Sequence, residues 1–410
     1  MSSHWSLFKN RNFGLFFASD ILSGFGVGMA TIGANWFVLM KTGTSANVGF
    51  MLAVNVIAGF VASLFSCVLT DRVSRQRLIF LTHALRAIGM GLVLAALWLD
   101  DFRMGYLYAF AVVNGIGWTV YMAASRSFLQ ELLDEKRYVS GNSLLEISLQ
   151  VGMFLAAGVS GFLYRVFSFN SILLVNVLMF VLSALVITLI RHQGDITAAN
   201  KENYWTSLRG GLAFLYHHKG IFTLGVISIV PLIVTMVYNV VLPDYVNTTL
   251  AQDSVAFGFA DMSYGIGGLI SGIALTAVAS NVRSERLIGL LFLLAALDLF
   301  LLAHNHQVVN LYLCSLILGL SNSSLRILMN SLLMSLVSKQ YMGRAMSVWL
   351  GISLIFQCGF SLSVSHFIDQ RGAKFGILVM ASMMAFGLVL FVAQQVVTHK
   401  KVHKQLGETL

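Results

Sequence analysis

Charged residues are scarce in this sequence. Of 410 residues, 26 are Lys or Arg and 17 are Asp or Glu, so that 10% are charged, whereas 57% are hydrophobic. A soluble protein of ordinary composition has about 25% charged residues. The sequence therefore predicts a polytopic membrane protein and excludes a soluble enzyme or a soluble nucleic-acid binder, despite the net charge of +9.

Cysteine and proline are also rare. The three cysteines (Cys67, Cys314 and Cys358) lie inside apolar runs, which argues against a disulfide framework or a thiolate metal site. The two prolines, Pro231 and Pro243, fall in one apolar stretch. Because proline frees a carbonyl and bends a helix, this stretch is expected to be either a moving gate or a static kink.

Sequence motifs of catalysis are absent. We find no metalloprotease box, nucleophile elbow or Walker sequence, which argues against an enzyme and an ATP-driven pump. His304 and His306 have no cysteine or carboxylate beside them, so they do not predict a metal site. We expect no cofactor and no metal. Residues 1–12 lack a signal peptide's features, and we expect them to stay on the cytoplasmic side.

Apolar runs of helical length follow one another along the chain. A bilayer core takes about 20 residues per helix, and lipid tolerates only helices and closed barrels. The expected fold is an all-α membrane protein with 12 transmembrane helices in two pseudo-symmetric six-helix bundles. The runs cover residues 13–39, 44–70, 78–98, 104–128, 140–163, 170–190, 219–242, 255–279, 286–303, 308–336, 345–367 and 374–397.

The distribution of basic residues sets an orientation. With both termini on the cytoplasmic side, 18 of the 26 Lys and Arg residues fall in cytoplasmic segments and five in outer segments, and Arg86, Arg126 and Arg326 fall within spans. Positive residues favour the cytoplasmic face. The basic balance is thus expected to orient helices and contact anionic lipid rather than mark an acidic partner.

A polar interruption divides the chain into similar halves. We expect a bundle over residues 1–190, a linker over 191–218 and a second bundle with a basic tail over 219–410. Within the linker, Trp205, Leu208, Leu212 and Leu215 recur at helical spacing, which predicts an amphipathic surface helix. Residues 77–79 and 286–288 both read Arg-Leu-Ile, and residues 133–138 resemble 336–341. Internal repeats of this kind are typical of secondary transporters, which bind substrate between repeats.

Polar residues follow one face of the first, fourth, seventh and tenth spans, which predicts that these spans line an aqueous path. Alternatively, the small residues among them only pack helices together. The face residues are Asp20, Gly24, Gly28, Thr31 and Asn35, then Asn114, Trp118, Tyr121 and Ser125, then Ser228, Thr235 and Asn239, and then Ser315, Gly319, Asn322, Arg326 and Asn330. The expected substrate contacts are Thr31, Asn35, Trp118, Tyr121, Asn239, Asn322 and Arg326.

Four charges (Asp20, Arg86, Arg126 and Glu146) lie within about three turns of the cytoplasmic ends of their spans. They are expected to share one layer. A charge retained in a span is a functional candidate, so we predict that Asp20 or Glu146 carries a proton and that Arg126 controls it. A static structural ion pair is the alternative.

Three further charges are expected in the second half. Arg326 is expected to be its buried cation and to contact an anionic group of the substrate, unless it extends to water. Asp261 and Asp298 are expected either in an outer gate or at solvated helix ends.

The loop after the second span resembles a known signature. Residues 71–77 read Asp-Arg-Val-Ser-Arg-Gln-Arg and are similar to the cytoplasmic signature of the major facilitator superfamily. The resemblance implies a cytoplasmic gate in which Asp71 latches against a helix N-terminus and Arg72 and Arg75 orient it. The alternative is an exposed charged turn.

Further segments resemble a subgroup of that superfamily. Residues 8–13, 82–86, 124–126 and 140–143 are similar to bacterial proton-coupled exporters of the macrolide-efflux and siderophore-export type. The resemblance implies that Arg126 takes part in proton coupling. In one segment the chain departs from the pattern, since residues 156–161 read Ala-Ala-Gly-Val-Ser-Gly, where antiporters carry a Pro and further Gly residues.

Together these patterns predict a monomeric secondary transporter of a bacterial inner membrane. The expected activity is proton-coupled export of a small amphiphilic compound such as a siderophore or drug by alternating access. The partners would be the substrate, protons and the lipid bilayer, without nucleic acid. A proton-coupled importer of an organic anion is the nearest alternative, and a non-transporting membrane sensor or a membrane-embedded enzyme is less favoured.

Overall fold

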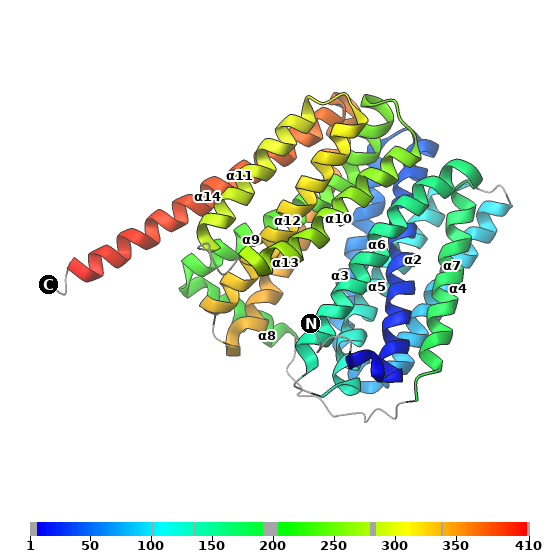
Figure 1. Cartoon of the computed structure of the whole chain (residues 1–410), viewed down its shortest axis with the longest axis horizontal. Helices are drawn as coiled ribbons and strands as arrows, with labels where there is room; N and C mark the ends of the chain where they lie inside the picture. Colours follow the sequence, from blue (N-terminus) through cyan, green and yellow to red (C-terminus); the bar gives the residue numbers. More distant parts are fainter. Residues whose placement is uncertain are drawn as a thin grey trace. The chain divides into compact units, whose positions relative to one another are not determined.

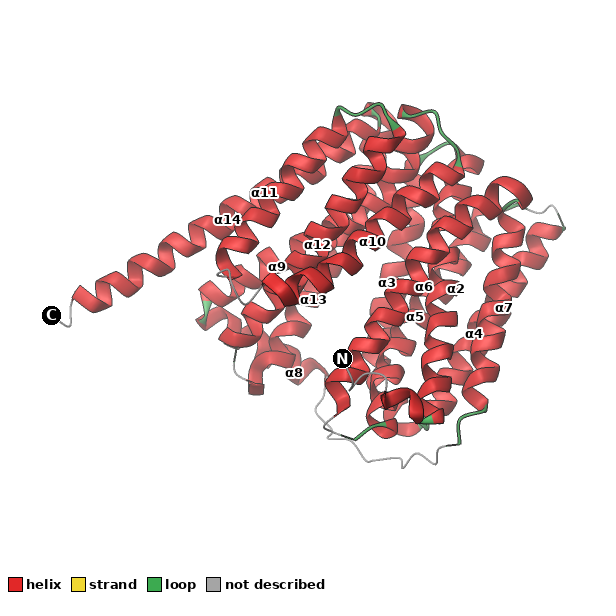
Figure 2. Cartoon of the chain, viewed as in Figure 1, coloured by secondary structure: helices red, strands yellow, loops and turns green. Residues whose placement is uncertain are grey.

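A computed structural model of the chain describes residues 6–99, 102–134, 137–191, 204–278, 284–337 and 339–407. Within these ranges the regular structure is helical, without strands (Figures 1 and 2). Eleven helices in the described ranges are long and apolar enough to cross a membrane. The predicted all-helical membrane fold is confirmed.

Each predicted apolar stretch corresponds to a helix, and most helices extend a few residues further at one end or both. A short 3₁₀ turn, η1 (Ser6–Lys9), precedes the first long helix. The helices are α2 (Arg11–Thr42), α3 (Ser45–Arg72), α4 (Arg75–Trp98), α5 (Met104–Leu132), α6 (Tyr138–Phe167), α7 (Phe169–Thr188), α8 (Tyr204–His217), α9 (Lys219–Asp244) continued by a π-helical turn (Tyr245–Thr249), α10 (Ser254–Val278), α11 (Ser284–Ala303), α12 (Val308–Leu336), α13 (Lys339–Arg371) and α14 (Ala373–Gly407).

The chain forms two compact units. Unit 1 comprises residues 1–201 and 251–265, and unit 2 comprises residues 202–250 and 266–410. The first part of α10 belongs to unit 1 because it packs closely on α6. A Cβ on Gly161 would lie 2.3 Å from the Ser254 carbonyl oxygen, so only glycine allows this approach. The exposed ion pair between Arg165 and Asp253 (3.0 Å) adds a contact.

The same helix pairings occur within each unit. In unit 1, α2 packs on α6 and α7, and α4 packs on α5 and α7; in unit 2, α9 packs on α13 and α14, and α11 packs on α12 and α14. Arg77 and Arg286, which begin the matching sequence segments, are each the third residue of their helices, α4 and α11. This correspondence supports an internal repeat.

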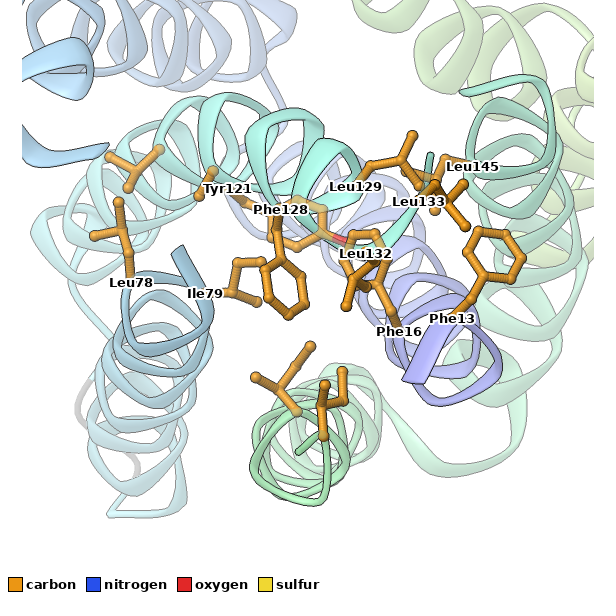
Figure 3. Close-up of a cluster of buried hydrophobic side chains, with 14 of the residues drawn as sticks. Phe13, Phe16, Leu78, Ile79, Tyr121, Phe128, Leu129, Leu132, Leu133 and Leu145 are labelled. Atoms are coloured by element: carbon orange, nitrogen blue, oxygen red, sulfur yellow. The ribbon is translucent and has the colours of Figure 1, made fainter. Parts of the chain in front are cut away.

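A hydrophobic cluster fills the end of unit 1 where α2, α4 and α6 begin and α5 and α7 end. Because lipid tails are as apolar as these side chains, van der Waals packing stabilises this contact more than release of water does. The cluster forms an apolar layer with Tyr121 among its members. Figure 3 labels Phe13, Phe16, Leu78, Ile79, Tyr121, Phe128, Leu129, Leu132, Leu133 and Leu145.

The beginning of α4 is joined to the end of α7 by one side chain. The Gln76 side-chain amide donates to the carbonyl oxygens of Ile187 and Ile190, at 2.8 Å each. The last carbonyls of a helix lack partners within the helix, so Gln76 caps α7 and fixes the register of α4 against it.

The predicted linker helix is present as α8, which packs on α13 within unit 2. The rings of Phe214 and Tyr341 stack with centroids 4.7 Å apart. Leu215 is buried and Leu212 is exposed, as expected for an amphipathic helix. Residues 192–203 and the side chains of Trp205 and Leu208 lie outside the described part of the chain.

Candidate functional site

Asp20 is the buried acid of unit 1. Its side chain is 1% exposed and accepts two hydroxyl hydrogen bonds: the Tyr121 hydroxyl on α5 donates to Oδ1, and the Ser148 hydroxyl on α6 donates to Oδ2. Glycines bring α2 and α6 close enough for this contact, since a Cβ on Gly152 would lie 2.8 Å from the backbone nitrogen of Phe25. Three helices therefore converge on one carboxyl group.

Arg86 is a buried cation on the neighbouring helix α4, with 1% of its side chain exposed. Its Nη2 donates to Oδ1 of Asn114 at 2.6 Å, and its guanidinium carbon lies 4.1 Å from the centroid of the Phe180 ring. Gly117 provides the space, because a Cβ there would lie 2.3 Å from Cδ of Arg86. Hydrogen bonding and cation–π contact thus hold the charge in place.

His83 lies one turn from Arg86 and is fully buried. Its ring centroid is 4.9 Å from that of Tyr121 and 6.0 Å from that of Phe180. Neither ring nitrogen has a hydrogen-bond partner among the described residues. His83 was not predicted as a site residue, although a histidine three residues before an intramembrane arginine lies on the same helical face and could have indicated it.

The structure brings three of the four predicted charges into one neighbourhood. Tyr121 interacts electrostatically with Asp20, Arg126 and Arg86, and Arg126 is half-buried. No ion pair joins Arg86 to a carboxylate that the structure describes. The side chain of the fourth, Glu146, lies outside the described residues, so its role stays a prediction.

A small cavity lies within unit 1 between α2, α3 and α5, with polar and apolar side chains in its lining. Its volume is about 40 Å³, and it is lined by Thr31, Asn35, Met51, Leu52, Asn55, Phe110, Ala111 and Asn114. Two predicted substrate contacts, Thr31 and Asn35, therefore line one cavity together with Asn114, which was predicted on the polar face of the fourth span (α5). Asn55, whose amide donates to the Ala111 carbonyl at 3.1 Å, was not predicted. Its position as an asparagine within the apolar run 44–70 is the sequence feature that could have indicated it.

The aromatic residues predicted on the α5 face lie close to the buried charges. Trp118 packs on a cluster formed by Val27, Ala87 and Phe180, and Phe180 is the ring beneath Arg86. Tyr121 contacts Asp20 through its hydroxyl. Both residues therefore belong to the surroundings of the buried charges in unit 1.

Polar residues of unit 2 join α9 to α12. The Asn322 amide donates to the Pro231 carbonyl (3.0 Å) and to the Thr235 hydroxyl (2.7 Å), and the Tyr238 hydroxyl donates to Ser315 (2.8 Å). In these contacts the polar residues hold two helices together, which is the alternative to lining an aqueous path. The carbonyl of Pro231 is thus fixed by a neighbouring helix.

The remaining predicted residues of the second half differ in exposure. Asn239 is half-buried. Arg326 is exposed, so the expectation of a buried cation there is wrong, and its role in binding an anionic group stays a prediction. Asp298 is only 4% exposed and contacts the Cys314 thiol, which contradicts a solvated helix end. Asp261 is half-buried.

The predicted cytoplasmic gate is described in part. The side chains of Asp71 and Arg72 lie outside the described residues. Arg75 forms an ion pair with Glu131 at the end of α5, with Nη1 and Oε1 2.6 Å apart and about one sixth of each side chain exposed (15% and 17%). Glu131 was not predicted, because nothing in a single sequence pairs these two positions.

Matching helix pairings in the two units and buried polar residues in their spans are the architecture expected of a secondary transporter. The sequence pattern of the Major Facilitator Superfamily matches residues 16–355. The chain belongs to the Major Facilitator Superfamily and is a multi-pass membrane transporter, as the resemblance implied.

Relatives and solved structures agree with this family. The chain is 22% identical to macrolide efflux protein A of Streptococcus pyogenes over 327 residues, which cover 77% of this chain and 79% of the relative. It is 23% identical to the multidrug efflux pump Tap of Mycolicibacterium fortuitum over 279 residues, 65% of this chain and 66% of the pump. The structure of the nucleoside transporter NupG superposes with a TM-score of 0.73 at 15% identity, covering 93% and 98% of the two chains.

Proposed function

We propose that this transporter is a proton-coupled exporter of a small amphiphilic organic compound such as a drug or a siderophore. Efflux proteins are among its relatives, at low identity. The excess of Lys and Arg in alternate loops supports a bacterial inner membrane with both termini cytoplasmic. The protein would act as a monomer and exchange protons for its substrate.

The buried acid Asp20 is the observation that carries this proposal. Both of its oxygens accept hydroxyl hydrogen bonds, and a hydroxyl group both donates and accepts. If Asp20 binds a proton, its new O–H group can donate to the oxygen of the Tyr121 or Ser148 hydroxyl. The number of hydrogen bonds at the carboxyl group can then stay the same. The charge of the site changes while its geometry persists.

A change of charge at Asp20 acts on the neighbouring cations. Arg86 and Arg126 interact electrostatically with Tyr121, as Asp20 does, and charges in a water-excluded environment interact strongly. We propose that Asp20, Arg126 and Glu146 form the proton-coupling set. The proton on Asp20 would alter which arrangement of the helices is favoured, which is the requirement for coupled transport.

Substrate contacts in this proposal are Thr31, Asn35, Trp118, Tyr121, Asn239, Asn322 and Arg326. They combine amide and hydroxyl groups with aromatic rings, which suits a compound with both polar and apolar surface. The exposed guanidinium of Arg326 would contact a carboxylate or another anionic group. Asp71, Arg72 and Arg75 would form the cytoplasmic gate.

Proton-coupled import of an organic anion is the second candidate. The observation in its favour is the basic character of the membrane-embedded sites, where Arg86 has no described carboxylate partner and Arg326 is exposed. The two candidates differ in the direction in which a proton gradient drives substrate, so one experiment distinguishes them.

The test uses purified protein in liposomes with a labelled macrolide as the probe. An antiporter accumulates the macrolide when the lumen is acidic, whereas a symporter accumulates its substrate when the outside is acidic. Asp20→Asn should abolish accumulation driven by the gradient and leave gradient-free exchange of macrolide across the membrane intact. The matched control is Asp244→Asn, a buried acid of unit 2 outside the proposed sites, which should retain both activities.

Gradient-driven flux that persists in Asp20→Asn would remove Asp20 from the mechanism. Accumulation only with an acidic exterior, tested with an organic anion as the probe, would replace export by import. A protein that moves neither probe under either gradient would contradict the proposed substrate class.

A further inference from the structure

Ser148 on α6 has two acceptors for one hydroxyl hydrogen. Its Oγ donates to Oδ2 of Asp20 and, at 2.8 Å, to the carbonyl oxygen of Leu145, one turn earlier on the same helix. A serine hydroxyl has a single hydrogen, which rotates to suit its surroundings. At any moment Ser148 therefore donates mainly to the carboxyl group or mainly to its own helix.

This contact is buried between closely packed helices. Ser148, Leu145 and Asp20 are each 1% exposed. A Cβ on Gly24, one turn after Asp20, would lie 3.3 Å from both Cα and the carbonyl oxygen of Leu149, so α2 and α6 approach each other closely beside Ser148. The side chains have little room to move apart, and the hydroxyl hydrogen is the part of the contact that is free to turn.

The two hydroxyl groups on Asp20 differ in what else they contact. The Tyr121 hydroxyl donates to Oδ1, whereas Ser148 donates to Oδ2 and has the Leu145 carbonyl as a second acceptor. When a proton binds to the carboxyl group, its new O–H must donate to a hydroxyl oxygen, and that hydroxyl must turn its own hydrogen elsewhere. Ser148 does so without losing a hydrogen bond.

Ionisable groups around Asp20 set the pH at which a proton binds. Apart from residues near helix ends, the ionisable side chains of α2 to α6 are Asp20 itself, His83 and Arg86 on α4, Tyr121 and Arg126 on α5, and Glu146 on α6, whose side chain lies outside the described residues. The sequence of α7 contains none. These groups decide when the proton binds, whereas Ser148 decides which oxygen carries it.

We propose that the proton of Asp20 binds at Oδ2 and that Ser148 is its positioning residue, an inference that rests on the proposed role of Asp20 in proton coupling. The proton forms an O–H bond at Oδ2 and is donated to the Ser148 oxygen. The Ser148 hydrogen turns from Oδ2 to the Leu145 carbonyl without breaking its covalent bond. Tyr121 remains a donor to Oδ1 in both forms.

Proton binding is thereby converted into a second hydrogen bond on the backbone of α6. A carbonyl oxygen has two lone pairs, so Leu145 accepts the serine hydrogen in addition to a helical N–H group. Serine hydroxyls that bond the preceding turn bend helices. α6 is also the helix that Gly161 brings against the start of α10, so a bend in α6 reaches a second helix of unit 1.

The experiment uses a thiol at this position as a spectroscopic reporter. In Ser148→Cys the S–H group keeps one donor hydrogen, and its infrared stretching band lies where proteins absorb little else and changes position with the acceptor. Spectra of the purified protein in detergent are compared between acidic and alkaline buffers. The band should have one position when Asp20 is protonated and another when it is ionised. In the double variant with Asp20→Asn it should keep one position at every pH.

Ser183→Cys is the matched control. Ser183 is a fully buried serine on α7 whose hydroxyl donates to the carbonyl oxygen of Ser19 at 2.8 Å, beside Asp20 in the sequence. Its S–H band should not change with pH. The three native cysteines contribute equally to both variants, so their bands cancel when the two are compared.

Tyr121→Phe provides an independent measurement. The carbonyl stretching band of protonated Asp20 is assigned by its loss in Asp20→Asn. With the proton on Oδ2 the carbonyl oxygen is Oδ1, which loses its Tyr121 donor in this variant, so the band should move to higher frequency. A band that stays in place would assign the proton to Oδ1 and overturn the proposal.

The outcomes separate this inference from the proposed function. A pH-independent S–H band in Ser148→Cys, with an Asp20 carbonyl band that still appears in acid, would overturn the role of Ser148 and leave Asp20 as the proton carrier. An S–H change of equal size in Ser183→Cys would reject the role of Ser148 as well. Absence of the Asp20 carbonyl band at every pH would instead reject Asp20 as the proton carrier, and this inference with it.

Discussion

Replacing Gly117 with alanine tests how tightly the buried charge of unit 1 is held. The new Cβ would lie 2.3 Å from Cδ, 2.6 Å from Cγ and 2.8 Å from Nε of Arg86. These distances are below van der Waals contact, so Arg86 must move. It cannot move freely, because Asn114 and Phe180 hold its guanidinium from other helices.

The expected cost follows from these contacts. Overpacking a filled interior costs about 1–3 kcal/mol, and losing the charged hydrogen bond to Asn114 costs about 1.5–3 kcal/mol. Alanine regains about 1 kcal/mol of helix propensity relative to glycine. The Gly117→Ala variant should therefore be less stable by about 2–5 kcal/mol.

The assay is unfolding in detergent followed by circular dichroism, with Gly91→Ala as the matched control. Gly91 lies inside α4, and a Cβ there would meet nothing within 4 Å, so this variant should be as stable as the native protein or slightly more stable. Adding Arg86→Ala to Gly117→Ala removes the atoms that clash, and the two changes should be coupled by more than 1 kcal/mol, within the range for contacting residues. Equal stability of the Gly117→Ala and Gly91→Ala variants would refute this account of Arg86.

Three further predictions concern other contacts. Arg75→Gln should lower stability by roughly 1 kcal/mol because its ion pair with Glu131 is largely buried. Arg165→Gln, in the exposed pair with Asp253, should lower it by under about 0.5 kcal/mol. Equal losses of stability in urea unfolding would contradict the role of burial. Arg326→Ala should weaken binding of an anionic compound more than that of a neutral analogue, and Arg326→Lys should restore part of it, as measured by fluorescence titration; equal loss for both compounds would reject charge recognition. Asn322→Leu removes hydrogen bonds to the Pro231 carbonyl and the Thr235 hydroxyl and should destabilise unit 2 by about 1–3 kcal/mol; an unchanged unfolding curve would show that these bonds contribute nothing.

Much of the fold and part of the site could be predicted from the sequence. The length of apolar runs fixed the helices because lipid leaves few alternatives, and helical spacing placed Asp20 and Tyr121 on the faces that now meet. Thr31 and Asn35 were identified by the same periodicity. The helices and the faces on which these residues lie could be predicted because each depends on one helix at a time, whereas the roles of the residues in binding and coupling stay predictions.

The site residues that were not predicted form contacts between two helices. Ser148 on α6 and Glu131 on α5 gain their importance from Asp20 and Arg75, and the register between helices decides such pairs. The burial of Arg326 was wrong for a related reason. Asn322 is one turn away on the same helix and is buried, whereas the longer arginine side chain is exposed, which sequence spacing alone does not determine.

The hydrophobic cluster at one end of unit 1 has a consequence for the voltage dependence of the proposed proton coupling. An electrical potential falls mainly across material of low dielectric constant, and moving one charge through 100 mV is worth about 2.3 kcal/mol. Apolar side chains fill the side of unit 1 where α2 begins. If Asp20 carries the coupled proton, as proposed, a proton that leaves it in that direction crosses the steeper part of the field. Current recordings should therefore show that the step on this side carries most of the voltage dependence of the cycle.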